Sequence, residues 1–412
     1  MSGILRWAGS IAAGTAVGQG IVMLATPWLA RVYTPADFGG LALVSTVSNL
    51  AATAGPLRFD LAVPTVPASE VRGLVAASLG AAAVLAAAAG IVVLAAGRTG
   101  RLAALPPGVA GAALVAGGVF LPAAYQAAAA LLLRRRSPAG LGFVRGSQGV
   151  LFTALAATRA AGLLWAHVLS WAAGLVALRE VARRRRPDDV SAREAVRRHW
   201  RYPALSLPGA VLDVVGYSQV VWVITAAYGA AALGQYAQVQ RLIAAPLMLV
   251  SASLGQVLLR NSAPLADDPT ALAALAGRVF SRLCAAAAVL LAAVAVAGEP
   301  ALRLVLGGQW LVDGGFLFAV ALAVCVRACV SPLSVLLLTR RRFDLALGWQ
   351  AAYCVSAATM LRLAAGRLTF REFCAAYAAH EVAFYAAYSA LIWYALRSPR
   401  VPLGAAPAVT DP

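Results

Sequence analysis

The chain has 412 residues, of which 61% are hydrophobic and 12% charged, and its mean hydropathy is +0.80. No soluble fold of this size could hide so much apolar surface from water, so the composition excludes a soluble protein and indicates a polytopic membrane protein. The formal net charge is +18, and all 34 basic residues are arginine.

Twelve segments are long and apolar enough to be membrane-spanning helices, since about 20 apolar residues cross a bilayer core of roughly 30 Å. In chain order they are residues 8–30, 39–57, 74–96, 109–133, 144–160, 163–179, 206–227, 236–259, 279–298, 315–338, 344–365 and 374–396. The fifth and sixth are the least clearly separated, because only Arg159 to Gly162 lie between them. The sequence therefore predicts an all-α membrane protein with about 12 transmembrane helices.

The distribution of arginine predicts the orientation of these helices. With the N-terminus inside, 24 arginines fall in cytoplasmic segments, 7 fall in outer segments, and Arg241, Arg327 and Arg362 fall within spans. By the positive-inside rule, both termini are predicted to be cytoplasmic. The first apolar run continues to about Leu29, so it is predicted to be a span and not a cleavable signal peptide.

The segment from Arg179 to Arg201 holds nine of the arginines. Such a run alone is compatible with a nucleic-acid patch, a nuclear-import signal or a solvated linker. The spans on both sides favour a cytoplasmic connector, in which Arg183 to Arg186 meet anionic head groups at about 1 kcal/mol each. Ser191 to Trp200 is predicted to be a short interfacial helix, with Trp200 and Tyr202 as anchors.

The predicted domains are a six-helix lobe at residues 1–182, the connector at 183–202, a second six-helix lobe at 203–398 and a disordered cytoplasmic tail at 399–412. Two pairs of segments support this duplication. Residues 33–39 (YTPADFG) match residues 228–234 (YGAAALG) at an offset of 195, and the arginines of LLLRRR at 131–136 match those of LLLTRRR at 336–342 at an offset of 206. Each pair joins segments on the same predicted side of the membrane, so the repeats are parallel.

Several stretches resemble a known family. They are LARVYTPADFGGLALV, LRFDLAVPTV, RYPALSLPGAVLD, YGAAALGQYAQVQRLIAAPL and RACVSPLSVLLL. Together they resemble the bacterial polysaccharide transporters, the O-antigen and capsule repeat-unit flippases of the multidrug/oligosaccharidyl-lipid/polysaccharide exporter superfamily. The resemblance extends to about Gln350, and its pieces occur in the order found in the family.

This resemblance implies two pseudo-symmetric six-helix bundles around a central cavity. It implies a flippase, not an enzyme, that moves an undecaprenyl-diphosphate-linked oligosaccharide from the cytoplasmic to the outer leaflet by alternating access, for cell-surface polysaccharide biosynthesis. The implied location is the bacterial inner membrane. Membrane lipids and polysaccharide assembly proteins are candidate partners, and neither a cofactor nor nucleic acid is expected.

Transport of a diphosphate through hydrocarbon requires fixed cations, and arginine within a span is unfavourable unless it faces a cavity or a partner. Arg327, Arg241 and Arg362 are therefore candidate diphosphate-binding residues. The alternatives are a structural ion pair or, above all for Arg362 near a span end, a side chain that snorkels to the interface.

Two further groups are candidates for gating and coupling. Alternation in an extended segment would place Arg58 and Asp60 on one side, at a cytoplasmic gate or a local salt bridge. Arg31 and Asp37 are their outer counterparts, near a tight turn predicted from Pro35 and Gly39, and for these two a structural role is favoured over gating. Acids and histidines within spans are the usual sites of proton or sodium coupling, so Asp213, His380 and Glu381 are the coupling candidates. Asp213 lies about one turn from the span edge, which is also compatible with a position at the membrane interface.

Two rival functions are compatible with twelve spans. A multidrug exporter of the same superfamily would share the fold, but exporters of small cations are expected to place acids in the cavity, whereas the deep charges here are mostly arginine. A polysaccharide polymerase typically has a large outer loop, and no outer segment here exceeds about twenty residues. The sequence has no P-loop, no paired Cys or His metal spacing and no Gly-x-Ser-x-Gly elbow.

Overall fold

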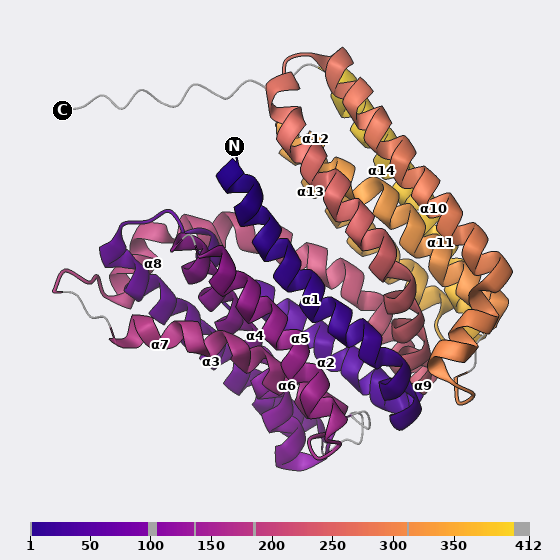
Figure 1. The fold of residues 1–412 in the computed structure, drawn as a ribbon, viewed down its shortest axis with the longest axis horizontal. Helices are drawn as coiled ribbons and strands as arrows, with labels where there is room; N and C mark the ends of the chain where they lie inside the picture. The colour runs from indigo at the N-terminus through magenta and orange to yellow at the C-terminus, as the bar shows by residue number, and fades with distance from the viewer. Residues whose placement is uncertain (1, 98–104, 136, 184–186, 311–312, 399–412) are drawn as a thin grey trace. The chain divides into compact units, whose positions relative to one another are not determined.

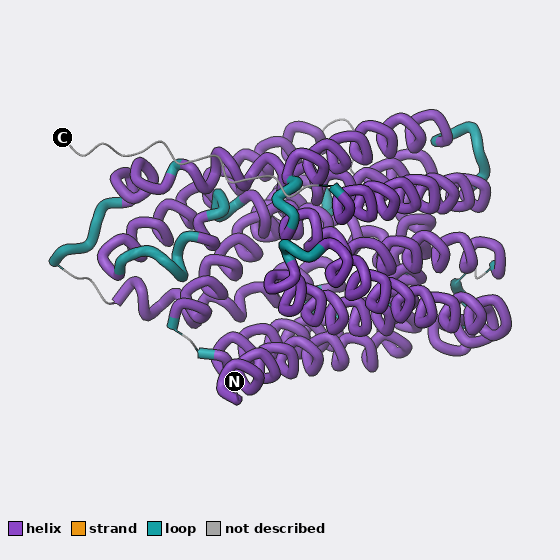
Figure 2. The backbone as a smooth tube through the Cα atoms, turned by 90° about the horizontal axis from the view of Figure 1, so that it is seen from above, coloured by secondary structure: helices purple, strands orange, loops and turns teal. Residues whose placement is uncertain are grey.

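The structure is a computed structural model of the chain, and it describes every residue except 1, 98–104, 136, 184–186, 311–312 and 399–412. The described residues form helices joined by short loops, with no strand among them (Figures 1 and 2). The predicted all-α fold is thus confirmed. The predicted disordered tail and most of Arg183 to Arg186 lie outside the described residues.

The α-helices are, in chain order, α1 (Ser2–Val32), α2 (Pro35–Ala54), α3 (Ala68–Gly97), α4 (Gly108–Arg134), α5 (Pro138–Ala157), α6 (Gly162–Ser170), α7 (Leu175–Arg183), α8 (Ala192–His199), α9 (Arg201–Ser262), α10 (Pro269–Leu306), α11 (Gly314–Val330), α12 (Val335–Thr339), α13 (Phe343–Ala364) and α14 (Phe370–Arg397). Four 3₁₀ turns, η1 (Phe59–Leu61), η2 (Trp171–Gly174), η3 (Ala263–Leu265) and η4 (Ser331–Ser334), lie between them.

The twelve predicted spans fall on these helices, with irregularities at four of them. The sixth span is α6, η2 and α7 in succession, and the tenth is α11, η4 and α12. The seventh and eighth spans lie in α9, which consists of two helices that meet in a kink at Gly229, where φ is 84° and ψ is 175°. Glycine suits this kink because other residues rarely adopt such a positive φ.

Six segments are long and apolar enough to cross a membrane, judged by length and composition within the described residues. They are Ala68–Gly97, Gly108–Arg134, Gly162–Arg179, Arg201–Leu247, Pro269–Leu306 and Gly314–Thr339. Their apolar surfaces identify an integral membrane protein, because each would otherwise expose a span-length apolar helix to water.

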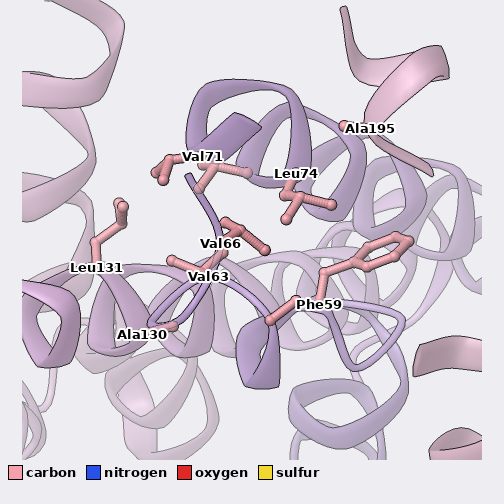
Figure 3. Close-up of a cluster of buried hydrophobic side chains, with 10 residues drawn as sticks. Phe59, Val63, Val66, Val71, Leu74, Ala130, Leu131 and Ala195 are labelled. Carbon is pink, nitrogen blue, oxygen red and sulfur yellow. The ribbon is translucent and has the colours of Figure 1, made fainter. Parts of the chain in front are cut away.

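The chain forms two compact units. Unit 1 comprises Met1–Gln238 and Arg303–Leu311, and unit 2 comprises Val239–Leu302 and Val312–Pro412. A core of unit 1 lies where η1 and the start of α3 meet α4 and α8, around the fully buried Phe59 and Leu74 (Figure 3). The division into lobes at 1–182 and 203–398 stays a prediction.

The predicted repeat has a counterpart at the atomic level in unit 1. A Cβ atom added to Gly39 in α2 would lie 1.9 Å from the carbonyl oxygen of Ala230, and one added to Gly234 in α9 would lie 1.8 Å from that of Pro35. Both pairs relate residues through the same offset of 195, so the two matched segments contact each other about a local two-fold axis. Gly39 lies inside α2 and not in a turn, so its predicted role is wrong: its lack of a side chain permits this close approach.

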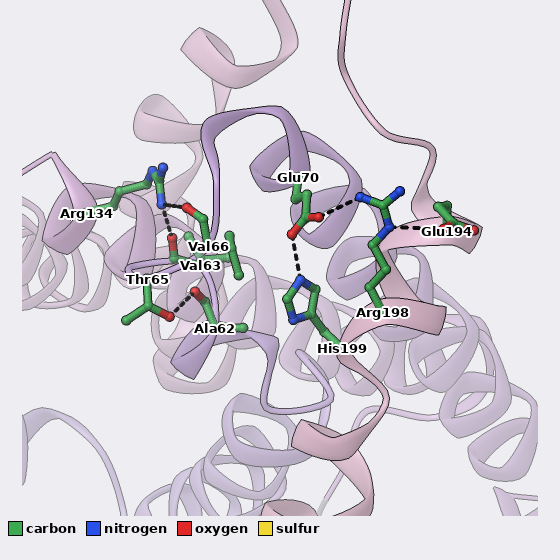
Figure 4. A network of polar contacts seen from close by, with 9 residues as sticks. All are labelled: Ala62, Val63, Thr65, Val66, Glu70, Arg134, Glu194, Arg198 and His199. Carbon is green, nitrogen blue, oxygen red and sulfur yellow. Dashed lines mark hydrogen bonds and ion pairs between the residues drawn. The ribbon is translucent and has the colours of Figure 1, made fainter. Parts of the chain in front are cut away.

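The matched arginines at the ends of the fourth and tenth spans make similar contacts, each within its own unit. In unit 1, Arg134 donates to the carbonyl oxygens of Val63 and Val66 at 2.9 and 2.5 Å (Figure 4). In unit 2, Arg340 donates to the carbonyl oxygen of Ala266 at 2.8 Å and to that of Ser398. Each guanidinium therefore donates to carbonyl groups outside its own helix. For Arg134 these lie in the loop after the second span, and for Arg340 one of them lies in the loop after the eighth span.

Candidate functional site

In unit 2, three buried polar side chains surround Arg327. Its guanidinium contacts Glu381 at 2.5 Å from Nη2 to Oε2. The same nitrogen donates to the hydroxyl groups of Tyr353 and Tyr377 at 3.0 and 3.1 Å, and the Tyr353 hydroxyl donates to Glu381 Oε1 at 2.6 Å. These residues come from α11, α13 and α14, and we refer to Arg327, Tyr353, Tyr377 and Glu381 as the Arg327 cluster.

The two charged side chains of this cluster differ in their exposure to solvent. The side chain of Glu381 is 0% exposed and that of Arg327 is 23% exposed. Taking two charges out of water is unfavourable, and the attraction within a pair offsets this only when further hydrogen bonds satisfy the remaining atoms. The two tyrosine hydroxyls supply such bonds, so the cluster holds a compensated ion pair in a membrane helix bundle.

Aromatic rings enclose the cluster. The Arg327 guanidinium lies 5.8 Å from the centroid of the Tyr385 ring, within range of a cation–π interaction. Trp349 stacks on Tyr388 with centroids 3.9 Å apart. His380 stacks on Phe384 at 4.7 Å, and its Nε2 shares a hydrogen bond of 3.0 Å with the Ser356 hydroxyl. The structure thus brings three predicted residues together: Arg327, His380 and Glu381, with His380 Nδ1 3.9 Å from Glu381 Oε1.

The other two embedded arginines make no hydrogen bond or ion pair with the described residues of this cluster. Arg241 is partly buried in the part of α9 that belongs to unit 2, and among the described residues it has no hydrogen bond or ion pair. Arg362 is exposed in the last turn of α13, where a cation interacts favourably with the helix dipole. Asp213 is in the first part of α9, in unit 1, so it belongs to a different unit from Glu381 and His380.

Arg31, a predicted gate residue, anchors the end of α10 to α1 within unit 1. Its guanidinium donates to the carbonyl oxygens of Leu304 and Val305 at 2.7 and 3.1 Å. Gln309 donates to the carbonyl oxygen of Tyr33 at 3.0 Å, and the Trp310 indole donates to that of Ala30 at 2.9 Å. We refer to Arg31, Gln309 and Trp310 as the Arg31 cluster.

Asp37 lies close to Arg31 in the sequence, in the first turn of α2, where it has a structural role. Its carboxylate accepts hydrogen bonds from the backbone and the hydroxyl of Thr34, both at 2.8 Å, while the Thr34 hydroxyl accepts from the Asp37 backbone at 3.2 Å. This reciprocal arrangement is a capping box that begins α2. Asp37 therefore has a local structural contact, and Arg31 is occupied by the α10 carbonyls.

Arg58 and Asp60 adopt a conformation that differs from the prediction. The extended segment expected there is wrong: Leu57 and Arg58 have φ of 51° and 59°, and residues 59–61 form the 3₁₀ turn η1. Burial raises the pKa of Asp60, and the attraction of Arg58 offsets this only in part. Asp60 Oδ1 is buried without a hydrogen-bond partner among the described residues, so this carboxylate is held in an unfavourable environment.

Several residues of these clusters were not identified from the sequence. Tyr353, Tyr377, Gln309 and Trp310 give no local signal, because an aromatic or amide side chain in or near a span is most often a packing residue. The contacts of Gln309 and Trp310 also depend on the turn at Gly307, which has a φ of 92°.

Comparisons with known proteins agree with this architecture. A model of the family described as polysaccharide biosynthesis protein matches residues 141–313. Among curated protein sequences no match is found.

Among solved structures, the lipid II flippase MurJ in an inward closed conformation is similar, with a TM-score of 0.70 at 9% identity, over 96% of this chain and 88% of that one. An inward-facing multidrug resistance MATE family transporter of the MOP superfamily has a TM-score of 0.54 at 15% identity, over 94% of both chains. A eukaryotic MATE transporter has a TM-score of 0.51 at 14% identity, over 96% of this chain and 98% of that one. The chain therefore has the all-helical, two-bundle fold of the MOP-superfamily transporters and flippases.

Proposed function

We propose that this protein is a flippase that moves an undecaprenyl-diphosphate-linked oligosaccharide from the cytoplasmic to the outer leaflet of the bacterial inner membrane by alternating access. The family model for polysaccharide biosynthesis and the fold shared with the lipid II flippase support a transporter of lipid-linked sugars. Membrane lipids and polysaccharide assembly proteins are its proposed partners, with both chain termini in the cytoplasm.

The observation that carries the proposal is the embedded arginine Arg241. Its charge is not compensated by a described acidic side chain, in contrast to Arg327, which contacts Glu381. An unpaired guanidinium inside a membrane bundle is costly unless an anion binds to it, and a diphosphate offers oxygens in the geometry that arginine prefers. Arg241 is thus the leading diphosphate residue, with Arg327 and Arg362 as further candidates.

Coupling to an ion gradient is assigned to the Arg327 cluster with His380. Protonation of Glu381 would release Arg327 from this ion pair, and so would a cation that binds Glu381 in place of the guanidinium. The released guanidinium could then attract an anion. Asp213 is a second coupling candidate, in unit 1. Arg31 and Asp37 belong to the outer gate and Arg58 and Asp60 to the inner one. Outward opening requires two sets of hydrogen bonds to break: those of Arg31 with the end of α10, and that of Trp310 with α1.

The test is transport by purified protein in vesicles that contain an undecaprenyl-diphosphate-linked fluorescent oligosaccharide. Arg241→Gln is expected to reduce the flipping rate about tenfold or more, because one lost charge-assisted bond amounts to roughly 1.5–3 kcal/mol. Arg260→Gln is the matched control, since Arg260 is an exposed arginine of the same helix and its loss leaves the rate unchanged. Equal rates for wild type and Arg241→Gln would remove Arg241 from the mechanism.

An ion-coupled multidrug exporter is the second candidate, because the fold is also that of a multidrug resistance MATE transporter. Deletion of the gene distinguishes the two. Accumulation of a lipid-linked repeat unit in the inner leaflet supports the flippase, whereas unchanged lipids with increased sensitivity to cationic drugs support the exporter.

A further inference from the structure

Helix α8 is fixed to unit 1 by one of its faces. Ala195 is fully buried in the core formed by η1, α3 and α4 (Figure 3). The backbone N–H of Val190 donates to the carbonyl oxygen of Ser69 at 2.9 Å. Gly73 permits this docking, because a Cβ atom there would lie 2.7 Å from the Val190 carbonyl oxygen and 2.9 Å from the Ala195 side chain. The helix therefore has a defined inner face.

Glu70 of α3 fastens the same helix through the side chains of Arg198 and His199. Its Oε1 accepts from Arg198 Nη1 at 2.8 Å, and its Oε2 contacts His199 Nε2 at 2.7 Å (Figure 4). Arg198 also contacts Glu194 at 3.0 Å, and its hydrogen bonds to Glu70 and Glu194 raise its pKa. Arg198 and His199 thus hold α8 against α3. These contacts fix which residues of α8 face away from α3.

The outer face of α8 presents cations that docking leaves exposed. Arg193 and Arg197 of α8 lie four residues apart, about one helical turn, and Arg201, the first residue of α9, follows four residues later; all three are exposed. The side chain of Arg197 is 83% exposed, and its contact with Glu194 is 3.8 Å long. Trp200, between them, is 56% exposed. We refer to Arg193, Arg197, Trp200 and Arg201 as the α8 outer face.

The chain directly after this face indicates what covers it. Leu205, in the first turns of α9, is 77% exposed, and α9 continues as a membrane-spanning candidate. An exposed tryptophan beside arginines, next to an exposed apolar turn of a span, is the composition found where protein meets lipid head groups. An acidic soluble partner would not account for the exposed leucine.

We propose that the α8 outer face binds the phosphate-bearing head group of an anionic phospholipid, with Arg193, Arg197 and Arg201 contacting the phosphate and Trp200 lying at the head-group level. This site is separate from the transport residues, and it holds whichever substrate the protein moves. Because α8 precedes α9 directly and is fastened to α3 through Glu70, a bound lipid would fix the start of α9 at the membrane surface.

The test is native mass spectrometry of the full chain in detergent with equal concentrations of phosphatidylglycerol and phosphatidylcholine. Wild type is expected to retain phosphatidylglycerol preferentially. The double variant Arg193→Gln/Arg197→Gln is expected to lose about tenfold or more of this preference, as each basic residue near an anionic surface strengthens binding roughly fivefold. Both residues are exposed, so the variant is expected to fold normally.

The matched control is Arg159→Gln/Arg367→Gln, which removes two exposed arginines on the side predicted to be outside. It leaves the preference unchanged if the proposal is right. Equal retention of both lipids by wild type, or an equal loss in the two double variants, overturns it. Displacement of phosphatidylglycerol by an equal concentration of inorganic phosphate also overturns it, because the site would then recognise a free anion and not a lipid.

Discussion

Glu381 carries a full charge at a position with no exposure to solvent, and Arg327 is what makes this tolerable. Replacing one partner leaves the other charge buried and uncompensated, whereas replacing both with apolar residues removes the unfavourable desolvation altogether. The pair therefore stabilises the fold only as a pair.

We expect Glu381→Gln to lower the free energy of unfolding by about 3–5 kcal/mol, the usual effect of breaking a buried pair. The double variant Arg327→Met/Glu381→Leu is expected to recover most of this loss. Thermal unfolding of the purified variants in detergent measures both. A single variant as stable as wild type would show that Glu381 is not charged in the folded protein.

Asp60 is a partly buried acid that Arg58 compensates only in part, so burial raises its pKa. An acid with a raised pKa binds its proton more tightly when folded, so the free energy of unfolding falls as pH rises above the ordinary value near 4. Asp60→Asn is expected to be more stable than wild type at pH 7 and to differ little near pH 4. Thermal unfolding across this range tests the prediction, and a stability difference that does not change with pH contradicts it.

At the scale of helices, α2 and α9 approach each other through backbone atoms at Gly39 and Gly234. A methyl group less than 2 Å from a carbonyl oxygen cannot be accommodated without moving one helix. Because the clashing atom is backbone, no rotamer change relieves it.

We expect Gly39→Ala and Gly234→Ala each to lower the melting temperature by several degrees, and the double variant to be only slightly worse, because either change already separates the helices. Gly80→Ala in α3 is the control, since a Cβ there meets nothing within 4 Å and alanine favours a helix. Additive effects of the two glycine variants would show that the contacts are independent.

Helix α8 offers a second test at this scale, because Glu70 joins it to α3. Glu70→Ala removes both contacts and is expected to release α8, so that limited proteolysis cuts between α7 and α9 faster than in wild type. Glu194→Ala removes only exposed ion pairs, which contribute about 0–1 kcal/mol, and is expected to leave the cleavage rate unchanged. Equal rates for wild type and Glu70→Ala would show that the apolar core alone holds α8.

At the scale of the whole chain, the lengths of the hydrophobic segments predicted the spanning helices well. The short helix α8 was predicted separately, as an interfacial helix at Ser191 to Trp200. The 3₁₀ turn at 59–61 was not predicted, since the conformation of Leu57 and Arg58 depends on packing around Phe59. The Arg327–Glu381 contact joins residues 54 positions apart, and sequence spacing does not show which helix faces meet. The two residues were therefore assigned separate roles, as a substrate site and a coupling site.

The contact between Gly39 and Ala230, mirrored by Gly234 and Pro35, has the symmetry of a homodimer interface within one polypeptide. In a true homodimer every substitution would appear twice and alter both contacts together. Covalent fusion removes this restriction, so Pro35 can begin α2 while its counterpart Ala230 directly follows Gly229, where the two helices of α9 meet. Each half of the contact is therefore free to change in sequence without an identical change in the other half.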